Sequence, residues 1–132
     1  MEELGKTPYE RLGGEAVVRR LVEHFYDAMG RSEPELTRLH RCDEHGQVCR
    51  ESRDRFALFF IGWLGGPEDY VKQNGHPRLR MRHGRVAVDV AMRDAWMRAM
   101  ITALDEVGVS GRVRGFLQQR LAEVADFLRN TE

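Results

Sequence analysis

The sequence has no excess charge of either sign, since 21 Lys and Arg residues balance 21 Asp and Glu residues. That balance argues against a general nucleic-acid binder, although a local basic patch stays open. No run of about 18 apolar residues occurs, which argues against a membrane-spanning helix. The charged N-terminus has no apolar stretch of the kind found in secretory signals. We therefore expect a single domain over residues 1–132 that acts in the cytoplasm.

Cysteine is also scarce, with only Cys42 and Cys49 in the chain. Cytosolic proteins rarely form disulfides, so we expect two free thiols. On one helix, the two residues would be separated by about 10 Å of rise, too far for a disulfide. A redox pair is the alternative if Cys42 lies in a loop. A metal site would need more ligands at closer spacing.

Apolar residues recur at helical spacing along most of the chain, and no hairpin turn separates two alternating runs. A short helix should begin at Pro8, with Thr7 and Glu10 forming a capping box, and should end at Gly13. Gly30 and Pro34 should end the next helix, and a short helical turn follows. A polar loop should then begin at residue 41. Four longer amphipathic helices have their apolar faces within residues 17–29, 56–63, 88–104 and 113–128. The last of these should bury Phe116.

The stretch GHPRLRMRHGR, residues 75–85, lies in a segment without acidic residues that runs from 72 to 88. Its alternation imitates a strand, but an isolated strand would have nothing to pair with in a helical chain. Pro77 instead suits the first position of a short helix, and Gly84 the position just past its end. Leu79 and His83 then share an inward face. The rim of this short helix would carry Arg78, Arg80 and Arg82.

These residues alone leave several interpretations of the basic stretch open. His83 could be an ordinary histidine near a helix C-terminus, favoured there by the helix dipole. The arginines from Arg78 to Arg85 could instead bind a nucleic acid or another anion, in which case binding would depend strongly on salt. Elsewhere, Tyr26 and Trp96 are the polar members of apolar helix faces, and their O–H and N–H groups need partners when buried.

Four blocks, in this order and spacing, resemble the truncated haemoglobins of group II. They are FY at residues 25–26, WLGGP at 63–67, GHPRLRMRH at 75–83 and RDAWMRAM at 93–100. The similarity runs from about Pro8 to near the C-terminus. The resemblance implies an all-α truncated globin, a two-over-two helical sandwich around haem b.

The resemblance also implies roles for individual residues. His83 matches the proximal histidine that binds the haem iron. Tyr26 and Trp96 match distal donors of hydrogen bonds to a ligand that acquires partial negative charge. Ser52 matches the position of the distal histidine in larger globins. The apolar contacts with the haem would come from Phe56, Phe59, Phe60, Leu79 and Trp96. The haem propionates would be bound by Arg80, Arg82 and Tyr70.

Two departures from the family pattern affect the distal side. His40 stands where an aromatic ring commonly packs on the haem, and it could donate a third hydrogen bond, bind the iron itself or face solvent. The segment 41–50 is several residues longer than usual. His45 should be exposed in that segment, and His76 should shape the turn before Pro77 rather than bind iron.

We therefore expect a bacterial haem protein that reversibly binds O₂ and other small ligands at a pentacoordinate or weakly hexacoordinate iron, and not an enzyme. The alternative is a haem enzyme with peroxidase or nitric oxide dioxygenase activity in the same pocket. Any reductase would be a separate protein, because the chain has no flavin or nicotinamide fingerprint. Neither nucleic acid nor membrane is expected as a partner, and the protein should be a monomer or weak homodimer.

Overall fold

The structure is a computed structural model, and it describes residues 7–75 and 89–128. Within these two ranges the only β pairing is an isolated bridge, and none of the helices is long and apolar enough to cross a membrane. The described part of the chain is therefore all-helical, as predicted. Its helices are α1 (Pro8–Leu12), α2 (Glu15–Ser32), α3 (Pro34–Thr37), α4 (Arg50–Trp63), α5 (Asp69–Asn74), α7 (Val90–Val107) and α8 (Gly111–Leu128).

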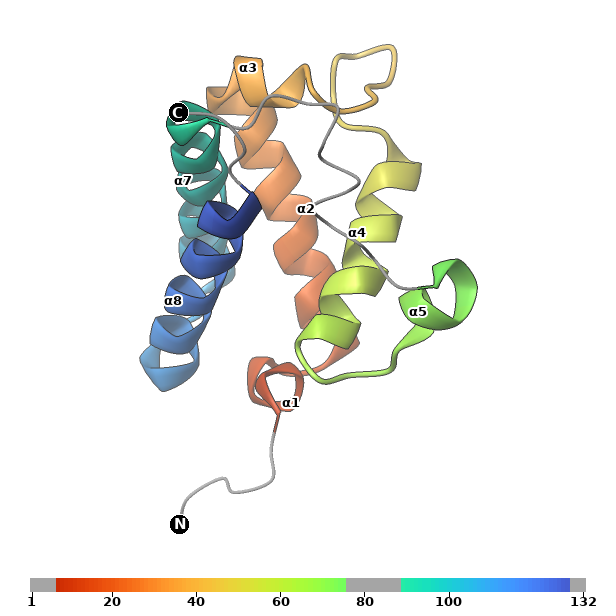
Figure 1. The fold of residues 1–132 in the computed structure, drawn as a ribbon, viewed down its shortest axis with the longest axis vertical. Helices are drawn as coiled ribbons and strands as arrows, with labels where there is room; N and C mark the ends of the chain where they lie inside the picture. Colours follow the sequence, from red (N-terminus) through yellow and green to blue (C-terminus); the bar gives the residue numbers. More distant parts are fainter. Residues whose placement is uncertain (1–6, 76–88, 129–132) are drawn as a thin grey trace.

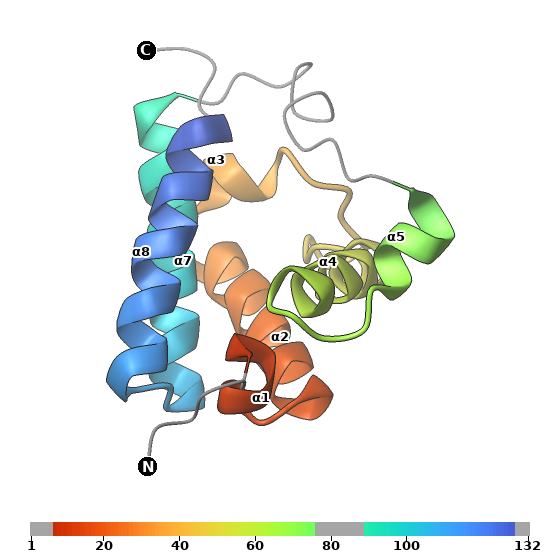
Figure 2. The same ribbon diagram turned by 60° about the horizontal axis from the view of Figure 1, so that its bottom comes forward.

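The fold is built from two helix pairs, α2 with α4 and α7 with α8, joined by the packing of α2 on α7. Figure 1 shows α7 and α8 side by side on one side of α2, and α4 on the other. Figure 2 shows α5 beyond α4, on the side away from α7 and α8. The interface between α2 and α7 buries the apolar side chains Val18, Leu21, Phe25, Met29, Ala99, Met100, Ala103 and Leu104.

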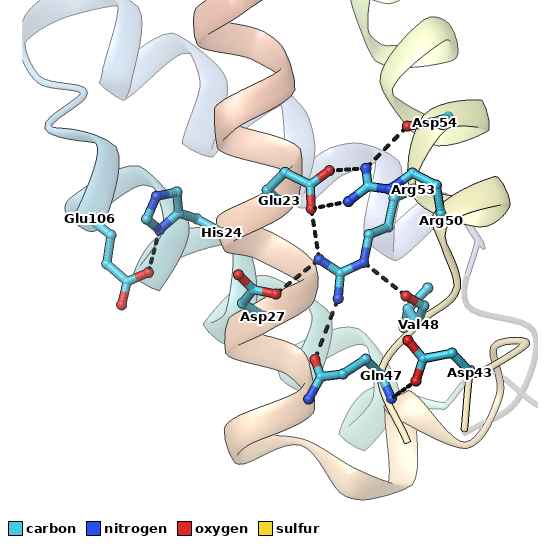
Figure 3. Close-up of polar contacts among 10 residues, drawn as sticks. All are labelled: Glu23, His24, Asp27, Asp43, Gln47, Val48, Arg50, Arg53, Asp54 and Glu106. Carbon is cyan, nitrogen blue, oxygen red and sulfur yellow. Dashed lines mark hydrogen bonds and ion pairs between the residues drawn. The ribbon is translucent and has the colours of Figure 1, made fainter. Parts of the chain in front are cut away.

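Polar contacts at the rim of this interface join the same two helices. His24 Nδ1 donates to a Glu106 carboxylate oxygen at 2.8 Å, as Figure 3 shows, and Arg31 donates to the other oxygen at 2.9 Å. Arg98 forms two hydrogen bonds with Glu33 just after α2, at 2.8 and 2.9 Å. The two halves of the chain are therefore linked by both apolar burial and charge pairs.

The WLGGP block packs against the start of the first helix. α1 begins with the predicted capping box, in which Thr7 Oγ1 accepts from the Glu10 N–H at 3.2 Å and the Thr7 N–H donates to the Glu10 carboxylate at 3.0 Å. The Tyr9 N–H donates to the Leu64 carbonyl at 3.0 Å. Gly65 has a φ of +100°, and a Cβ added there would lie 2.7 Å from the Thr7 Cβ. The block therefore needs glycine for both its backbone conformation and this close approach.

We expect Gly65→Ala to destabilise the protein by about 1–3 kcal/mol, because alanine is strained at this φ and would displace Thr7. Gly115→Ala is the matched control, since Gly115 is an exposed residue of α8 and nothing lies within 4 Å of an added Cβ. It should stabilise the protein by about 0.5–1 kcal/mol, because alanine favours helix. Urea unfolding of both variants measures the difference, and shifts of the same sign would contradict this account.

Two local predictions are wrong, and one short helix was not predicted. Gly30 does not end α2, which continues to Ser32, and an added Cβ at Gly30 would lie 3.3 Å from the Gln47 side-chain oxygen. No pattern in the sequence indicated α5, a helix of six residues that packs on α4. Phe116 is 46% exposed, because α8 turns Leu117 and Leu121 toward the core and Phe116 lies about 100° away around the helix.

Residues 41–49 form a small turn-back that we call the 41–49 hairpin. Cys42 pairs with Val48 across an antiparallel bridge, and the Cys49 N–H donates to the Arg41 carbonyl at 2.9 Å. Because successive residues of paired segments point to opposite faces, this register directs the side chains of Cys42 and Cys49 to opposite faces. Both thiols are free, as predicted. His45 is exposed, also as predicted.

Candidate functional site

Aromatic rings from four helices and the loop after α3 form one connected group, which we call the aromatic cluster. Neighbouring ring centroids lie between 4.9 and 6.3 Å apart. Such spacings are typical of favourable aromatic contacts. The members of the cluster are Phe25, Tyr26, His40, Phe56, Phe59, Phe60, Trp63, Tyr70 and Trp96.

Tyr26 contacts three other rings of this cluster. Its side chain comes from the buried face of α2, the residue is 5% exposed, and its ring contacts Phe25 at 4.9 Å and His40 at 5.7 Å. No hydrogen bond from a described residue is among the causes that shift the pKa of its hydroxyl. Burial raises the pKa of Tyr26 above its ordinary value of 10.0, so the group stays an O–H donor.

Trp96 brings a second donor to the same group of rings. It is a partly buried residue of α7, and its ring packs edge-on against Phe25 at 5.1 Å. Within residues 7–75 and 89–128 its indole N–H has no hydrogen-bond acceptor. Tyr26 and Trp96 therefore contact one shared ring, and each carries a hydrogen-bond donor. This arrangement fits a bound molecule with an apolar surface and a partly negative end.

His40 lies against Tyr26 and is half-buried, so it is not a solvent-facing loop histidine. Its Nδ1 lies 3.0 Å from the Leu36 carbonyl oxygen. A carbonyl can only accept, so Nδ1 carries the proton and Nε2 of the neutral ring has a lone pair. Neutral His40 can therefore accept a hydrogen bond or bind a metal through Nε2, whereas donating from Nε2 requires the doubly protonated ring.

A buried arginine of α4 adjoins the cluster, and sequence reasoning missed it. Arg53 is 6% exposed and binds Glu23 and Asp27 of α2 at 2.8 and 2.9 Å, as Figure 3 shows. It also donates to the Val48 carbonyl at 2.9 Å and to the Gln47 side chain at 3.4 Å. One signal could have found it, since residue 53 falls at the spacing of the inward-facing positions 56, 57 and 60.

The charges around Arg53 form a small network. Arg50, which is largely exposed, donates to both oxygens of Glu23 and also pairs with Asp54 at 3.2 Å. The hydrogen bond from Arg50, followed by that from Arg53, holds the pKa of Glu23 below its ordinary value. The guanidinium carbon of Arg53 lies 5.7 Å from the centroid of the Tyr26 ring. The network therefore contacts the predicted distal tyrosine directly.

The structure brings most of the predicted site residues together. Tyr70 is buried on α5 and packs edge-on against Phe59 at 5.7 Å. Phe56 stacks on Phe60 at 5.4 Å and also contacts Tyr26 at 5.8 Å. The predictions for His83, Arg82, Arg80 and Leu79 lie outside the described residues, and so does the predicted short helix that carries them.

The described helices bury a cluster of aromatic rings, which fits the packing of helices around a haem pocket in globins. The chain belongs to the bacterial-like globin family, which matches residues 7–130. The group 2 truncated hemoglobin YjbI of Bacillus subtilis (strain 168) is 35% identical to it over 124 residues, covering 94% of this chain and 89% of the relative.

Solved structures of group II proteins match the same fold. The crystal structure of the group II truncated hemoglobin from Bacillus anthracis superposes with a TM-score of 0.87 at 32% identity, covering 98% of this chain and 95% of that one. The group II 2-on-2 hemoglobin from Agrobacterium tumefaciens has a TM-score of 0.87 at 31% identity and is covered completely, as is this chain. The resemblance to group II truncated haemoglobins and the two-over-two fold are thus confirmed.

Proteins of this family hold a haem cofactor with its iron, and oxygen binding is a function of the family. The residues of the aromatic cluster fit that cofactor. They offer apolar rings for the faces of a flat macrocycle, and the Tyr26 hydroxyl and Trp96 indole N–H as donors for a partly negative ligand.

Proposed function

We propose that the chain reversibly binds O₂ at a haem iron held by His83, with Tyr26 and Trp96 as hydrogen-bond donors to the ligand. The observation that carries this proposal is that two residues with donor groups, a hydroxyl on Tyr26 and an indole N–H on Trp96, pack against the same Phe25 ring. When bound, the haem supplies an iron with an open position for a small ligand. The protein's own residues supply the donors and exclude water.

The remaining cofactor contacts follow from the character of each side chain. Phe56, Phe59 and Phe60 would pack on the apolar faces of the haem, together with Leu79. Arg80 and Arg82 would pair with the propionates through charge-assisted hydrogen bonds, since no acid stands between residues 72 and 88 to compete for them. Tyr70 would add its hydroxyl there. These roles belong to one globin domain over residues 1–132.

His40 has a defined part in this proposal. Because its Nδ1 donates to the Leu36 carbonyl, neutral His40 would offer only the Nε2 lone pair. It would then bind the iron weakly from the distal side. That role would compete with the incoming ligand, so His40 would tune affinity rather than add a third donor.

Absorbance spectra of the purified protein test the proposal. We expect an intense Soret band, distinct ferric, ferrous and carbonmonoxy spectra, and an oxygen-bound form that returns to the ferrous spectrum when oxygen is removed. A colourless protein that binds nucleic acid in a salt-dependent manner would overturn it.

The same preparation distinguishes an oxygen-binding protein from a haem enzyme. Oxidation of a substrate by peroxide well above the rate with free haem would assign the site to a peroxidase. Sustained consumption of nitric oxide with a separate reductase would assign it to a dioxygenase. We expect neither to exceed the activity of a simple side reaction.

A further inference from the structure

We propose that Arg53 is a positioning residue for Tyr26, and that through it the 41–49 hairpin sets the geometry of the distal hydrogen bond. This inference rests on the proposed function, because it assumes that Tyr26 donates to the haem ligand. It concerns a residue that does not itself reach the ligand.

Arg53 is held from two directions at once. On one side its guanidinium binds Glu23 at 2.8 Å and Asp27 at 2.9 Å, both on α2. On the other side it donates to Val48 at 2.9 Å and to Gln47 at 3.4 Å, both in the 41–49 hairpin (Figure 3). The planar fork of an arginine satisfies all these acceptors in one orientation only. Because the side chain is also 93% buried, its position is closely restricted.

The carboxylates that hold Arg53 flank Tyr26 on its own helix. Glu23 stands three residues before Tyr26, and Asp27 follows it directly. The guanidinium therefore lies over the Tyr26 ring, with its central carbon 5.7 Å from the ring centroid, in the range of a cation–π contact. His40 and Phe56 contact the same ring edge-on at 5.7 and 5.8 Å. With Phe25 at 4.9 Å, the ring is thus packed between four side chains, and the guanidinium of Arg53 brings a positive charge to it.

The orientation of the ring determines where its hydroxyl lies. A donor displaced by about 1 Å loses much of its value to a bound ligand. If Arg53 were shortened or lost its fork, the Tyr26 ring would gain freedom and the hydrogen bond would weaken. The hairpin shares in this control, since Val48 and Gln47 supply two of the four acceptors of Arg53.

Arg53→Met tests the inference in the haem-loaded protein. Methionine keeps an apolar stem of similar length but has neither charge nor donors. We expect the rate of O₂ dissociation to rise about fivefold, a typical coupling between contacting residues. The C–O stretching band of the carbonmonoxy form should move to higher frequency, because it reports the polarity beside the ligand and not the stability of the fold.

Arg50→Met is the matched control. Arg50 binds the same Glu23 and lies on the same helix, but it is 62% exposed and has no contact with Tyr26. It should leave both the dissociation rate and the stretching band unchanged. Equal effects of the two variants would show a general role of the charge network and would overturn the positioning role.

A double-mutant cycle with Tyr26→Phe tests whether Arg53 affects O₂ release through the Tyr26 hydroxyl. If Arg53 acts through the Tyr26 hydroxyl, Arg53→Met should have no further effect on O₂ release once that hydroxyl is removed. A fivefold effect that persists in the Tyr26→Phe background would overturn the inference. An unchanged rate for Arg53→Met, beside a large effect of Tyr26→Phe alone, would overturn it while leaving the proposed function intact. No effect of Tyr26→Phe would instead count against the proposed function.

The folded state should survive Arg53→Met, because Glu23 keeps Arg50 as a partner and the Asp27 side chain is 49% exposed. If that variant does not load haem, Arg53→Lys replaces it. Lysine keeps the charge but cannot reach α2 and the hairpin with one planar fork. We expect faster O₂ release from Arg53→Lys as well, and a wild-type rate in this variant would overturn the inference.

Discussion

His83→Ala should abolish stable haem binding. The proposal gives the iron a single protein ligand on the proximal side, so removing the imidazole removes the bond that fixes the cofactor. Loss of a partner that merely supports a ligand typically costs 10- to 100-fold in metal affinity, and loss of the ligand itself should exceed roughly 100-fold. Haem transfer to an acceptor protein, followed by the Soret band, measures the change.

His76→Ala is the control for this experiment. His76 lies in the same basic stretch, seven residues earlier, but should shape the turn before Pro77. It should retain haem with a wild-type spectrum. Added imidazole should partly restore a ligated spectrum to His83→Ala, because it can occupy the space left by the side chain. A normal five-coordinate haem in His83→Ala, with haem loss in His76→Ala, would reverse the assignment.

Tyr26→Phe should accelerate O₂ dissociation roughly 10- to 100-fold. Hydrogen bonds to partly charged groups contribute about 1.5–3 kcal/mol, and each 1.4 kcal/mol is a factor of about ten in rate or affinity. Phenylalanine keeps the ring between Phe25 and Phe56, so only the hydroxyl is lost. Stopped-flow replacement of O₂ by carbon monoxide gives the rate directly.

Tyr9→Phe is the matched control, since Tyr9 carries the same hydroxyl but packs against Gly66, outside the aromatic cluster. It should release O₂ at the wild-type rate. Because burial raises the pKa of Tyr26, its donor should also persist up to at least pH 10.0, the ordinary value for the phenol. Equal rates for Tyr26→Phe and wild type would exclude Tyr26 as the distal donor.

Features with a local chemical cause could be predicted from the sequence. The capping box of Thr7 and Glu10 needs only residues three apart, and the stop after Trp63 needs only the glycines that follow it. The buried face of α2 follows from the helical spacing of its apolar residues alone. Tyr26 is recognisable there as a polar residue on an apolar face. That Tyr26 and Trp96 contact the same Phe25 ring fits the family resemblance and does not follow from spacing.

Features that depend on distant contacts could not be predicted in this way. α5 is too short to be stable by itself and depends on its packing against α4. The proton of His40 is placed by the Leu36 carbonyl, which a spacing pattern does not show. Arg53 has partners from α2 and the 41–49 hairpin, so its role becomes visible only when these segments meet.

The packing of α2 on α7 has a consequence for the order in which the chain can fold during synthesis. α2 is complete at Ser32, but the helix that covers its apolar face is not complete until Val107. At about 5–20 residues per second, the ribosome takes roughly 4–15 s to make the intervening chain. During that time the apolar face of α2, with Leu21, Phe25 and Met29, has at most the cover of α1, α3 and α4. The nascent chain is therefore most prone to aggregation before α7 emerges, and this early half is the part a chaperone would need to shield.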